Sequence, residues 1–130
     1  MFVKQYLTIM EHHAKSLRPF IGAKDYELSR RFYRELGFEE TVLSHNMCVF
    51  KTGDLSFYLQ DAYVQDWVDN TMLFLEVADL DGFWKDLLAL DLPGKFPTAK
   101  LGAIRDLDWG REGFIHDPAG NLWHVGMFFA

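Results

Sequence analysis

The order of apolar and polar positions in the first half of the chain predicts five elements. A short apolar run at 17–23 precedes the segment DYELSRRFYRELGF, in which Leu28, Phe32 and Leu36 recur at i, i+4 and i+8. This spacing predicts a helix that begins near Asp25 and ends at Gly37. Three short runs typical of β-strands follow at 38–43, 47–51 and 55–60. The first half is therefore predicted to form a strand, a helix and three strands, in that order.

The second half repeats this order after a mostly polar linker at 61–70. A strand is predicted at 71–77, and a helix with one apolar side begins at Asp79. A loop containing Pro93-Gly94 follows. Three more strands are predicted at 103–107, 112–116 and 122–128. The last two are joined by DPAGN, in which Asp117 caps a tight turn.

Two such halves predict an α+β fold of paired βαβββ modules, at about 17–60 and 71–128, within one domain at 17–130. Open four-stranded units each leave a concave face, and two of them can enclose a cleft. A doubly wound parallel fold fits poorly because three hairpin-like strands follow each helix. Residues 1–16 precede the domain, and the spacing of their apolar positions predicts a short amphipathic helix or arm.

Composition limits the possible partners. Aromatic residues make up 16% of the 130 residues, which suits either an aromatic core or a cavity with flat apolar walls. The net charge of −6 disfavours nucleic acid and anionic membranes and favours a cationic ligand. No run approaches about 18 apolar residues, so we expect no membrane span and no signal peptide. The single cysteine, Cys48, is expected in the core, and a reducing, cytoplasmic location follows.

Two groups of residues resemble the glyoxalase/bleomycin-resistance/dioxygenase (vicinal oxygen chelate) superfamily. The first helix resembles its first-module signature through Asp25, Ser29, Phe32-Tyr33 and Leu36-Gly37-Phe38. Asp108-Trp109-Gly110-Arg111-Glu112, followed by the DPAGN turn, is similar to the bleomycin-resistance branch, as is the segment from Asp69 to Asp81. The WGRE part is the more discriminating motif. The resemblance covers about 17–126.

The resemblance implies a homodimer with two ligand clefts at or near the subunit interface. Proteins of the bleomycin-resistance branch sequester a flat-ringed cationic drug without transforming it. Trp109 stands where those relatives place a drug-stacking Trp, and Asp108 beside it would attract the cation. Asn46 stands nearest the position of the second stacking aromatic, so half of that clamp is missing or moved. Another wall could be supplied by Tyr58, Phe57 and Trp67.

The superfamily's enzymes hold a divalent metal at positions that correspond here to Arg18, Phe57, Met72 and His124. Arginine and phenylalanine cannot ligate a metal, a thioether is a poor ligand for Zn²⁺, and one histidine does not make a site. We therefore expect no metal and no cofactor. His124 is then a hydrogen-bonded strand histidine or a polar contact in the cleft.

The sequence leaves three functions open. The favoured one is a metal-free protein that binds a small aromatic cation. The alternatives are a lyase- or dioxygenase-type enzyme with an atypical site, acting on a small carbonyl or aromatic substrate, and a degenerate member used for protein contacts. The candidate ligand-binding residues are Trp109, Asp108, Phe57, Tyr58, Asn46, Met72, His124 and Arg18.

Overall fold

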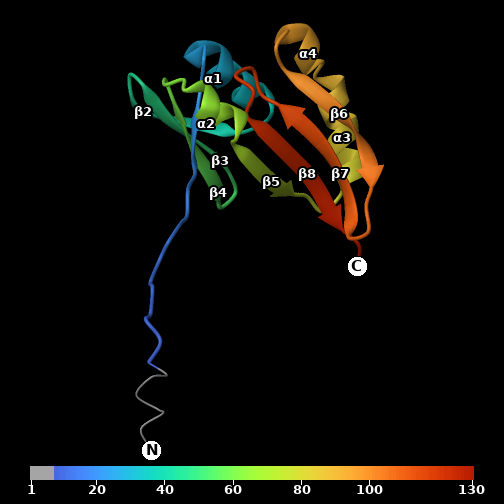
Figure 1. Ribbon diagram of the computed structural model, residues 1–130, viewed down its shortest axis with the longest axis horizontal. Coiled ribbons are helices and arrows are strands. Elements are labelled where there is room, and N and C mark those ends of the chain that lie inside the picture. The colour runs from blue at the N-terminus through green and yellow to red at the C-terminus, as the bar shows by residue number, and fades with distance from the viewer. Residues whose placement is uncertain (1–7) are drawn as a thin grey trace, which may run out of the picture.

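The computed structural model describes residues 8–130, and each half of the chain forms a four-stranded sheet with a helix against it (Figure 1). The first module contains β1 (Phe20–Gly22), α1 (Tyr26–Glu35), β2 (Glu39–Ser44), β3 (Met47–Thr52) and β4 (Leu55–Gln60). The second contains β5 (Met72–Glu76), α3 (Leu80–Ala89), β6 (Lys100–Asp106), β7 (Gly110–His116) and β8 (Leu122–Phe128). The predicted α+β fold of two βαβββ modules is confirmed.

The two sheets share one topology. The first sheet has the order β1-β4-β3-β2 and the second has the order β5-β8-β7-β6. In each sheet the first strand pairs parallel with the last, and the other pairs are antiparallel. Both helices begin at the predicted aspartates: Asp25 Oδ1 accepts from the Leu28 backbone N–H at 3.1 Å, and Asp79 Oδ1 accepts from that of Gly82 at 3.0 Å.

Two short helices were not predicted. α2 (Gln65–Asp69) lies in the segment interpreted as a linker, where Val68 is buried and anchors it to the core. α4 (Leu92–Lys95) contains the Pro93-Gly94 pair interpreted as a loop. Proline is tolerated in the first turn of a helix, because the N–H that it lacks has no intrahelical partner there. Among residues 8–130, no helix is long and apolar enough to cross a membrane.

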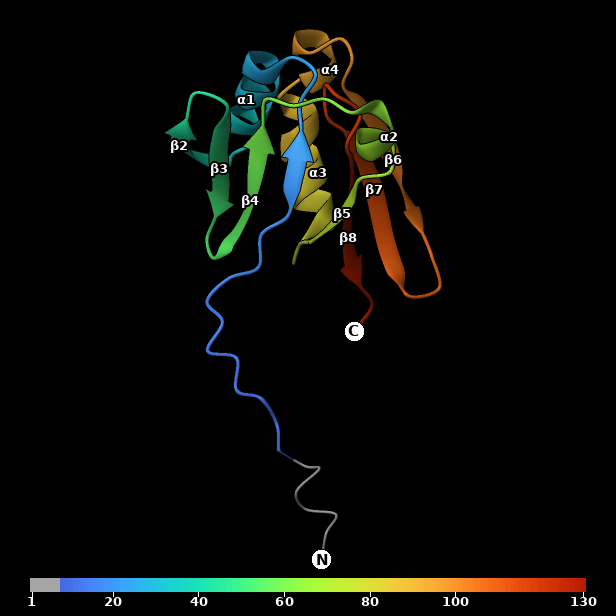
Figure 2. The ribbon, with the colours of Figure 1, turned by 60° about the vertical axis from the view of Figure 1, so that its left-hand side comes forward.

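The N-terminal segment differs from a helix where it is described. Residues 8–16 are exposed and carry neither helix nor strand, and Figures 1 and 2 show them running away from the two sheets. Residues 1–7 of the expected helix or arm lie outside the described residues. The described part is therefore an arm.

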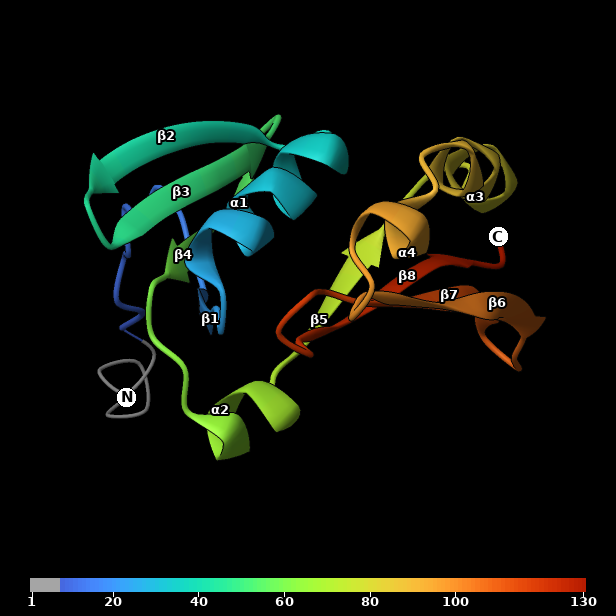
Figure 3. The same cartoon turned by 90° about the horizontal axis from the view of Figure 1, so that it is seen from above.

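One hydrophobic core joins the modules. Seen from above, α1 lies on the side of the first sheet that faces the second module (Figure 3). The Phe32 ring of α1 meets Phe96, which follows α4, edge to face at 5.4 Å. Trp123 of β8 packs 5.1 Å from Phe57 of β4, between ring centroids. Cys48 is buried in this core, as predicted.

A buried polar junction also links the modules. The Tyr33 hydroxyl donates to Asp117 Oδ2 at 2.6 Å and accepts from Trp123 Nε1 at 2.9 Å. Asn121 donates to the same carboxylate oxygen and to the Gly22 carbonyl, both at 2.8 Å. Asp117 Oδ1 accepts three backbone N–H groups of the DPAGN turn, which confirms the predicted turn-holding role. Burial raises the pKa of Asp117, and these hydrogen bonds act in the opposite direction.

Candidate functional site

The face of the second sheet that points away from the core, called here the outer face, follows from strand alternation. Trp123 and Val125 of β8 are buried, so His124 between them points outward. On the neighbouring β5, Phe74 pairs in register with His124 and is 46% exposed. Met72, two residues earlier, is 66% exposed. A folded protein does not usually leave such apolar side chains together in solvent without a role for them.

Three aromatic rings gather at one end of this face and are called here the aromatic cluster: Phe74, Trp109 and Phe128. Ring centroids are 5.0 Å apart for Trp109 and Phe128, and 5.8 Å apart from Phe74 to each of the other two. The Phe129 backbone N–H donates to the Trp109 carbonyl at 3.0 Å, which holds the Trp109 backbone beside the end of β8. All three side chains are partly exposed, so their ring faces can accept another flat ring.

A buried carboxylate lies on the same outer face. Glu112 of β7 is only 5% exposed. Its Oε2 lies 3.4 Å from His124 Nδ1, and its Oε1 lies 3.7 Å from Arg105 Nη2. Phe114, two residues along β7, meets the His124 ring at 4.9 Å and the Arg105 guanidinium at 5.0 Å. This polar group can attract a cation close to the rings.

Gly126 allows the Phe74 ring to lie across the sheet. A Cβ at this position would stand 2.9 Å from Phe74 Cζ and 3.3 Å from Glu112 Cβ. A side chain at this position would require the Phe74 ring to shift, so the glycine leaves room for that ring beside Glu112.

The first sheet presents a smaller group on its own outer face. Phe20 stacks on Tyr58 with centroids 4.6 Å apart. Arg18 Nη1 donates to the Tyr58 hydroxyl at 3.2 Å, and its guanidinium lies 5.6 Å from the centre of that ring. Within residues 8–130, the buried Nε of Arg18 has no hydrogen-bond partner. This sheet therefore offers flat apolar surface with a positive charge.

Several solved structures share this architecture. No protein-family model matches the chain, and no curated protein sequence matches it significantly. A bleomycin-binding protein from bleomycin-producing Streptomyces verticillus, complexed with copper(II)-bleomycin, matches with a TM-score of 0.75 and 23% identity, over 92% of this chain and all of that one. A bleomycin resistance determinant encoded on the transposon Tn5 matches at 0.74 and 17%, over 90% and 100%. Lactoylglutathione lyase from Agrobacterium tumefaciens matches at 0.66 and 20%, over 88% and 94%.

The chain has the glyoxalase/bleomycin-resistance fold. At these identities the likeness establishes the fold and leaves the ligand open. The matches include both binding proteins and an enzyme. Function must therefore be argued from the side chains of this chain.

Within this glyoxalase/bleomycin-resistance fold, the predicted ligand-binding residues divide between the two sheets. The second module contains Met72, Trp109, Asp108 and His124. The first contains Arg18, Asn46, Phe57 and Tyr58. Asn46 lies in the exposed β2–β3 turn, where its Oδ1 accepts from Ser44 Oγ at 2.7 Å. Trp109 instead contacts Phe74 and Phe128. Within one chain, Trp109 therefore packs against Phe74 and Phe128 and not against Asn46.

Phe57 does not lie on the outer face of the first sheet. It is 3% exposed and packs in the core against Tyr33 and Trp123, because β4 turns its odd-numbered residues inward. Its neighbour Tyr58 faces outward and stacks on Phe20. Phe57 instead lines a hollow of about 200 Å³ between the modules, together with Phe74 and Trp123. Its role as a wall of a ligand cleft stays a prediction, as does that of Tyr58.

Four residues of the site were missed by the sequence analysis: Phe74, Phe128, Arg105 and Glu112. A usable signal was the parity of β8 and β5, since His124 pointing outward requires its partner Phe74 to do the same. For Glu112 the signal was its place in WGRE, where it was interpreted only as part of a motif. Its burial depends on neighbouring strands and could not be read from the sequence.

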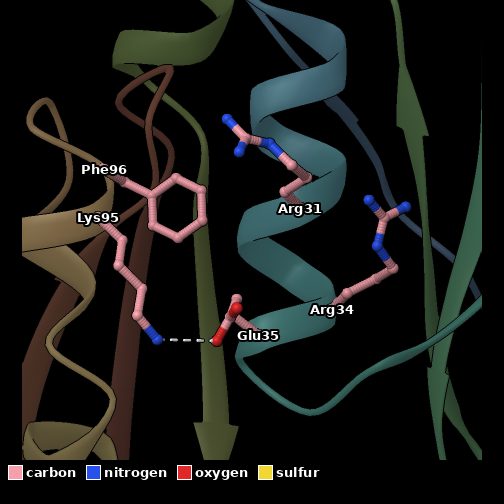
Figure 4. A pocket seen from close by; sticks show the side chains of 5 residues that line it. All are labelled: Arg31, Arg34, Glu35, Lys95 and Phe96. Carbon is pink, nitrogen blue, oxygen red and sulfur yellow. Dashed lines mark hydrogen bonds and ion pairs between the residues drawn. The ribbon is translucent and has the colours of Figure 1, made fainter.

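Metal-ligand clusters and deep hollows commonly mark functional sites, and neither supports a cation site elsewhere in the described residues. Among residues 8–130, no three His, Cys, Asp or Glu side chains are grouped so that they could hold a metal ion. A hollow of about 730 Å³ lies between α1 and α4 and is lined by Arg31, Arg34, Glu35, Lys95 and Phe96 (Figure 4). Lys95 and Glu35 bridge it at 3.2 Å. Three cations to one carboxylate do not suit the predicted cationic ligand, so we place the candidate site on the outer face of the second sheet.

Proposed function

We propose that this chain binds a flat aromatic cation on the outer face of its second sheet and does not transform it. The observation that carries the proposal is the aromatic cluster beside the buried carboxylate of Glu112. Stacking on one ring is worth about 0.5–1.5 kcal/mol beyond area burial, and three rings offer several such contacts. The net charge of −6 favours the approach of a cation. A bleomycin-type antibiotic is the proposed ligand class, because two structures of similar fold are a bleomycin-binding protein and a bleomycin resistance determinant.

The proposal includes a homodimer in the cytoplasm. Phe20 on the first sheet is 55% exposed, and Met72 and Phe128 on the second are 66% and 52% exposed. A second copy that covered these faces would remove them from water and would turn each outer face into one wall of a cleft. Cys48 is unpaired and buried, which agrees with a reducing compartment.

Calorimetric titration with a bleomycin-type drug and with a simple aromatic cation tests the binding. Trp109→Ala should weaken binding about tenfold or more, because stacking and contact area are lost together. Tyr63→Ala is the matched control, since Tyr63 is 38% exposed, close to the 37% of Trp109, and is not in the aromatic cluster. Equal affinity of the wild type and a folded Trp109→Ala protein would assign the indole a structural role. No binding by any protein would remove drug binding as the function.

A second titration concerns the missing half of the clamp. Asn46→Phe should strengthen binding of the bleomycin-type drug by restoring a second ring wall at the β2–β3 turn. The effect requires a partner copy, since Asn46 and Trp109 lie on different sheets of one chain. An unchanged affinity would mean that this turn does not face the ligand.

Metal content separates binding from the chemistry of metal-dependent relatives. We expect no stoichiometric transition metal after preparation with added metal, measured by elemental analysis. One tightly held ion per chain, lost in His124→Gln, would contradict the proposal in its present form.

An enzyme of glyoxalase type is the second candidate function. It is favoured by the His124–Glu112 pair, because a carboxylate 3.4 Å from the ring nitrogen could orient the imidazole as a general base. Turnover of small carbonyl or aromatic substrates that is abolished in His124→Gln would favour this candidate. A protein that binds a ligand tightly and returns it unchanged favours the first.

A further inference from the structure

Glu112 is held loosely for a buried carboxylate. Its side chain is 7% exposed, and burying a charge is costly unless the charge is well paired. Its partners are 3.7 Å away at Arg105 and 3.4 Å away at His124, longer than the ~2.7–2.9 Å of strong charge-assisted bonds. Arg111, the preceding residue on the opposite side of β7, forms bonds of 2.9 Å to both Asp81 and Asp106. The chain therefore builds tight ion pairs next to this loose one.

Arg105 occupies a position that a flat cationic ligand could take. Its guanidinium lies 5.0 Å from the centre of the Phe114 ring while one of its nitrogens points to the carboxylate of Glu112. A planar cation over a ring with a carboxylate at its edge is the general arrangement by which proteins recognise guanidinium and amidinium groups. The Arg105 side chain is 60% exposed, and its Nη2 lies 3.7 Å from the carboxylate, beyond the range of a strong charge-assisted hydrogen bond. It can therefore be displaced.

On the two adjacent strands, glycines face this position at two of the four paired residues, and the Phe74 ring of β5 lies over one of them, Gly126. In the register of the second sheet, Glu112 lies between Arg105 of β6 and Gly126 of β8. Phe114 lies between Gly102 of β6 and His124 of β8. A Cβ at Gly102 would lie 3.2 Å from Phe114 Cδ2 and would crowd the ring. Apart from Arg105 itself, only His124 supplies a side chain at these four cross-strand positions.

We infer that Glu112 and Phe114 form a subsite for a planar delocalised cation, an amidinium or guanidinium group, and that Arg105 fills this subsite until a ligand displaces it. This inference rests on the proposed function and narrows its ligand class. His124 connects the subsite to the aromatic cluster, since its ring lies 4.9 Å from Phe114 and 6.4 Å from Phe74. A ligand that joins an amidinium group to an aromatic ring matches this order of contacts. Arg105 lowers the affinity for every such ligand by competing for Glu112.

Benzamidine is the probe, and its neutral analogue benzamide has the same ring without the charge. Removing the competing side chain in Arg105→Ala should tighten benzamidine binding about fivefold, because the contact that the ligand would otherwise have to displace is long and therefore weak. Arg105→Gln should tighten it similarly, since its amide carries no charge. Benzamide should bind all variants equally weakly. The affinities are measured by NMR titration, in which the His124 and Phe114 ring signals should shift with benzamidine.

Arg31→Ala is the matched control, because Arg31 is also an exposed cation over an aromatic ring, 5.8 Å from the centre of Phe96. It changes the net charge by the same amount and lies on the helix side, away from Glu112. Tighter binding in both Arg105 variants with no change in Arg31→Ala supports the inference. Equal affinities in Arg105→Ala and wild type, an equal gain in Arg31→Ala, or no preference for benzamidine over benzamide would overturn it. Loss of drug binding with a preserved Arg105 effect would instead reject the proposed drug and keep the subsite.

Discussion

Tyr33→Phe should cost about 3 kcal/mol of unfolding free energy, because it removes one hydroxyl from the polar junction between the modules. Tyr33 is fully buried, and its hydroxyl both donates to Asp117 at 2.6 Å and accepts from Trp123 at 2.9 Å. The substitution keeps the ring, so the aromatic packing against Phe57 is preserved. What is lost is confined to the two hydrogen bonds.

The magnitude follows from the two partners. A hydrogen bond to a charged group contributes about 1.5–3 kcal/mol, and a buried N–H left without an acceptor costs about 1–3 kcal/mol. Asp117 keeps four other donors, from the Asn121 side chain and three backbone N–H groups. The cost therefore arises mainly because Trp123 Nε1 loses its acceptor and the Asp117 carboxylate loses one hydrogen bond that stabilises its charge. About 3 kcal/mol is a large share of the roughly 5–15 kcal/mol that stabilises a typical domain.

The cost should depend on pH in a defined direction. Burial raises the folded-state pKa of Asp117 above the unfolded value of about 3.9, while the bond from Tyr33 lowers it. Between the two pKa values the folded state holds more protons than the unfolded state, so the unfolding free energy falls as pH rises through this window. Without the hydroxyl the folded pKa rises further and the window extends upward. Tyr33→Phe should therefore cost more at pH 7 than at pH 4.

Urea denaturation of the wild type and the variant at both pH values is the assay, read from the midpoint at constant slope. The control is Tyr58→Phe, which removes a hydroxyl bonded to Arg18 at 3.2 Å on the outer face and should cost about 1 kcal/mol or less. Equal costs for the two variants, or a Tyr33→Phe cost that shrinks toward neutral pH, would refute the reasoning about the junction.

Three further predictions concern the helices, the sheet and the assembly. Asp25→Ala and Asp79→Ala each remove a helix cap and should each cost about 1 kcal/mol in urea denaturation, whereas Asp54→Ala, in an exposed turn, should cost less than about 0.5 kcal/mol. Gly126→Ala should cost about 1–3 kcal/mol and weaken ligand binding, since its Cβ would stand 2.9 Å from Phe74 Cζ; unchanged binding would contradict the placement of that ring. Sedimentation at micromolar concentration should give about twice 15.2 kDa, and a monomer at all concentrations would contradict the proposed dimer.

The order of elements could be predicted because local signals agree with the tertiary structure. Asp25 and Asp79 cap their helices as their side chains allow, and Gly37 adopts a φ of 100° after the first helix. α2 and α4 could not be predicted, because helices of five and four residues give too little periodicity to detect. Buried anchors, Val68 and Leu92, hold them instead, and burial depends on the rest of the fold.

The site could be predicted only in part, because the face on which a strand residue lies changes with a shift of one position. Phe57 and Tyr58 are adjacent and both aromatic, and only the pairing of β4 decides that the first is buried. Trp109 could be selected from its motif, but its ring partners Phe74 and Phe128 come from strands 35 residues before and 19 residues after it. Contacts at that separation are fixed by sheet register, which local composition does not specify.

The repeated register allows the two sheets to be compared position by position. Phe20 and Tyr58 pair on the first sheet as Phe74 and His124 pair on the second. Both outer faces therefore keep an aromatic pair at the same place.

Their charges differ. Two residues beyond His124, Gly126 pairs with the buried Glu112; two beyond Tyr58, Gln60 pairs with Met47, which is apolar. The first sheet instead carries Arg18 against Tyr58. A cleft lined by one first sheet and one second sheet would thus have rings on both walls, a carboxylate on one and a guanidinium on the other. Because like charges repel, a bound cation would be drawn toward the second sheet, so Trp109 and Glu112 are the residues whose substitution decides the proposal.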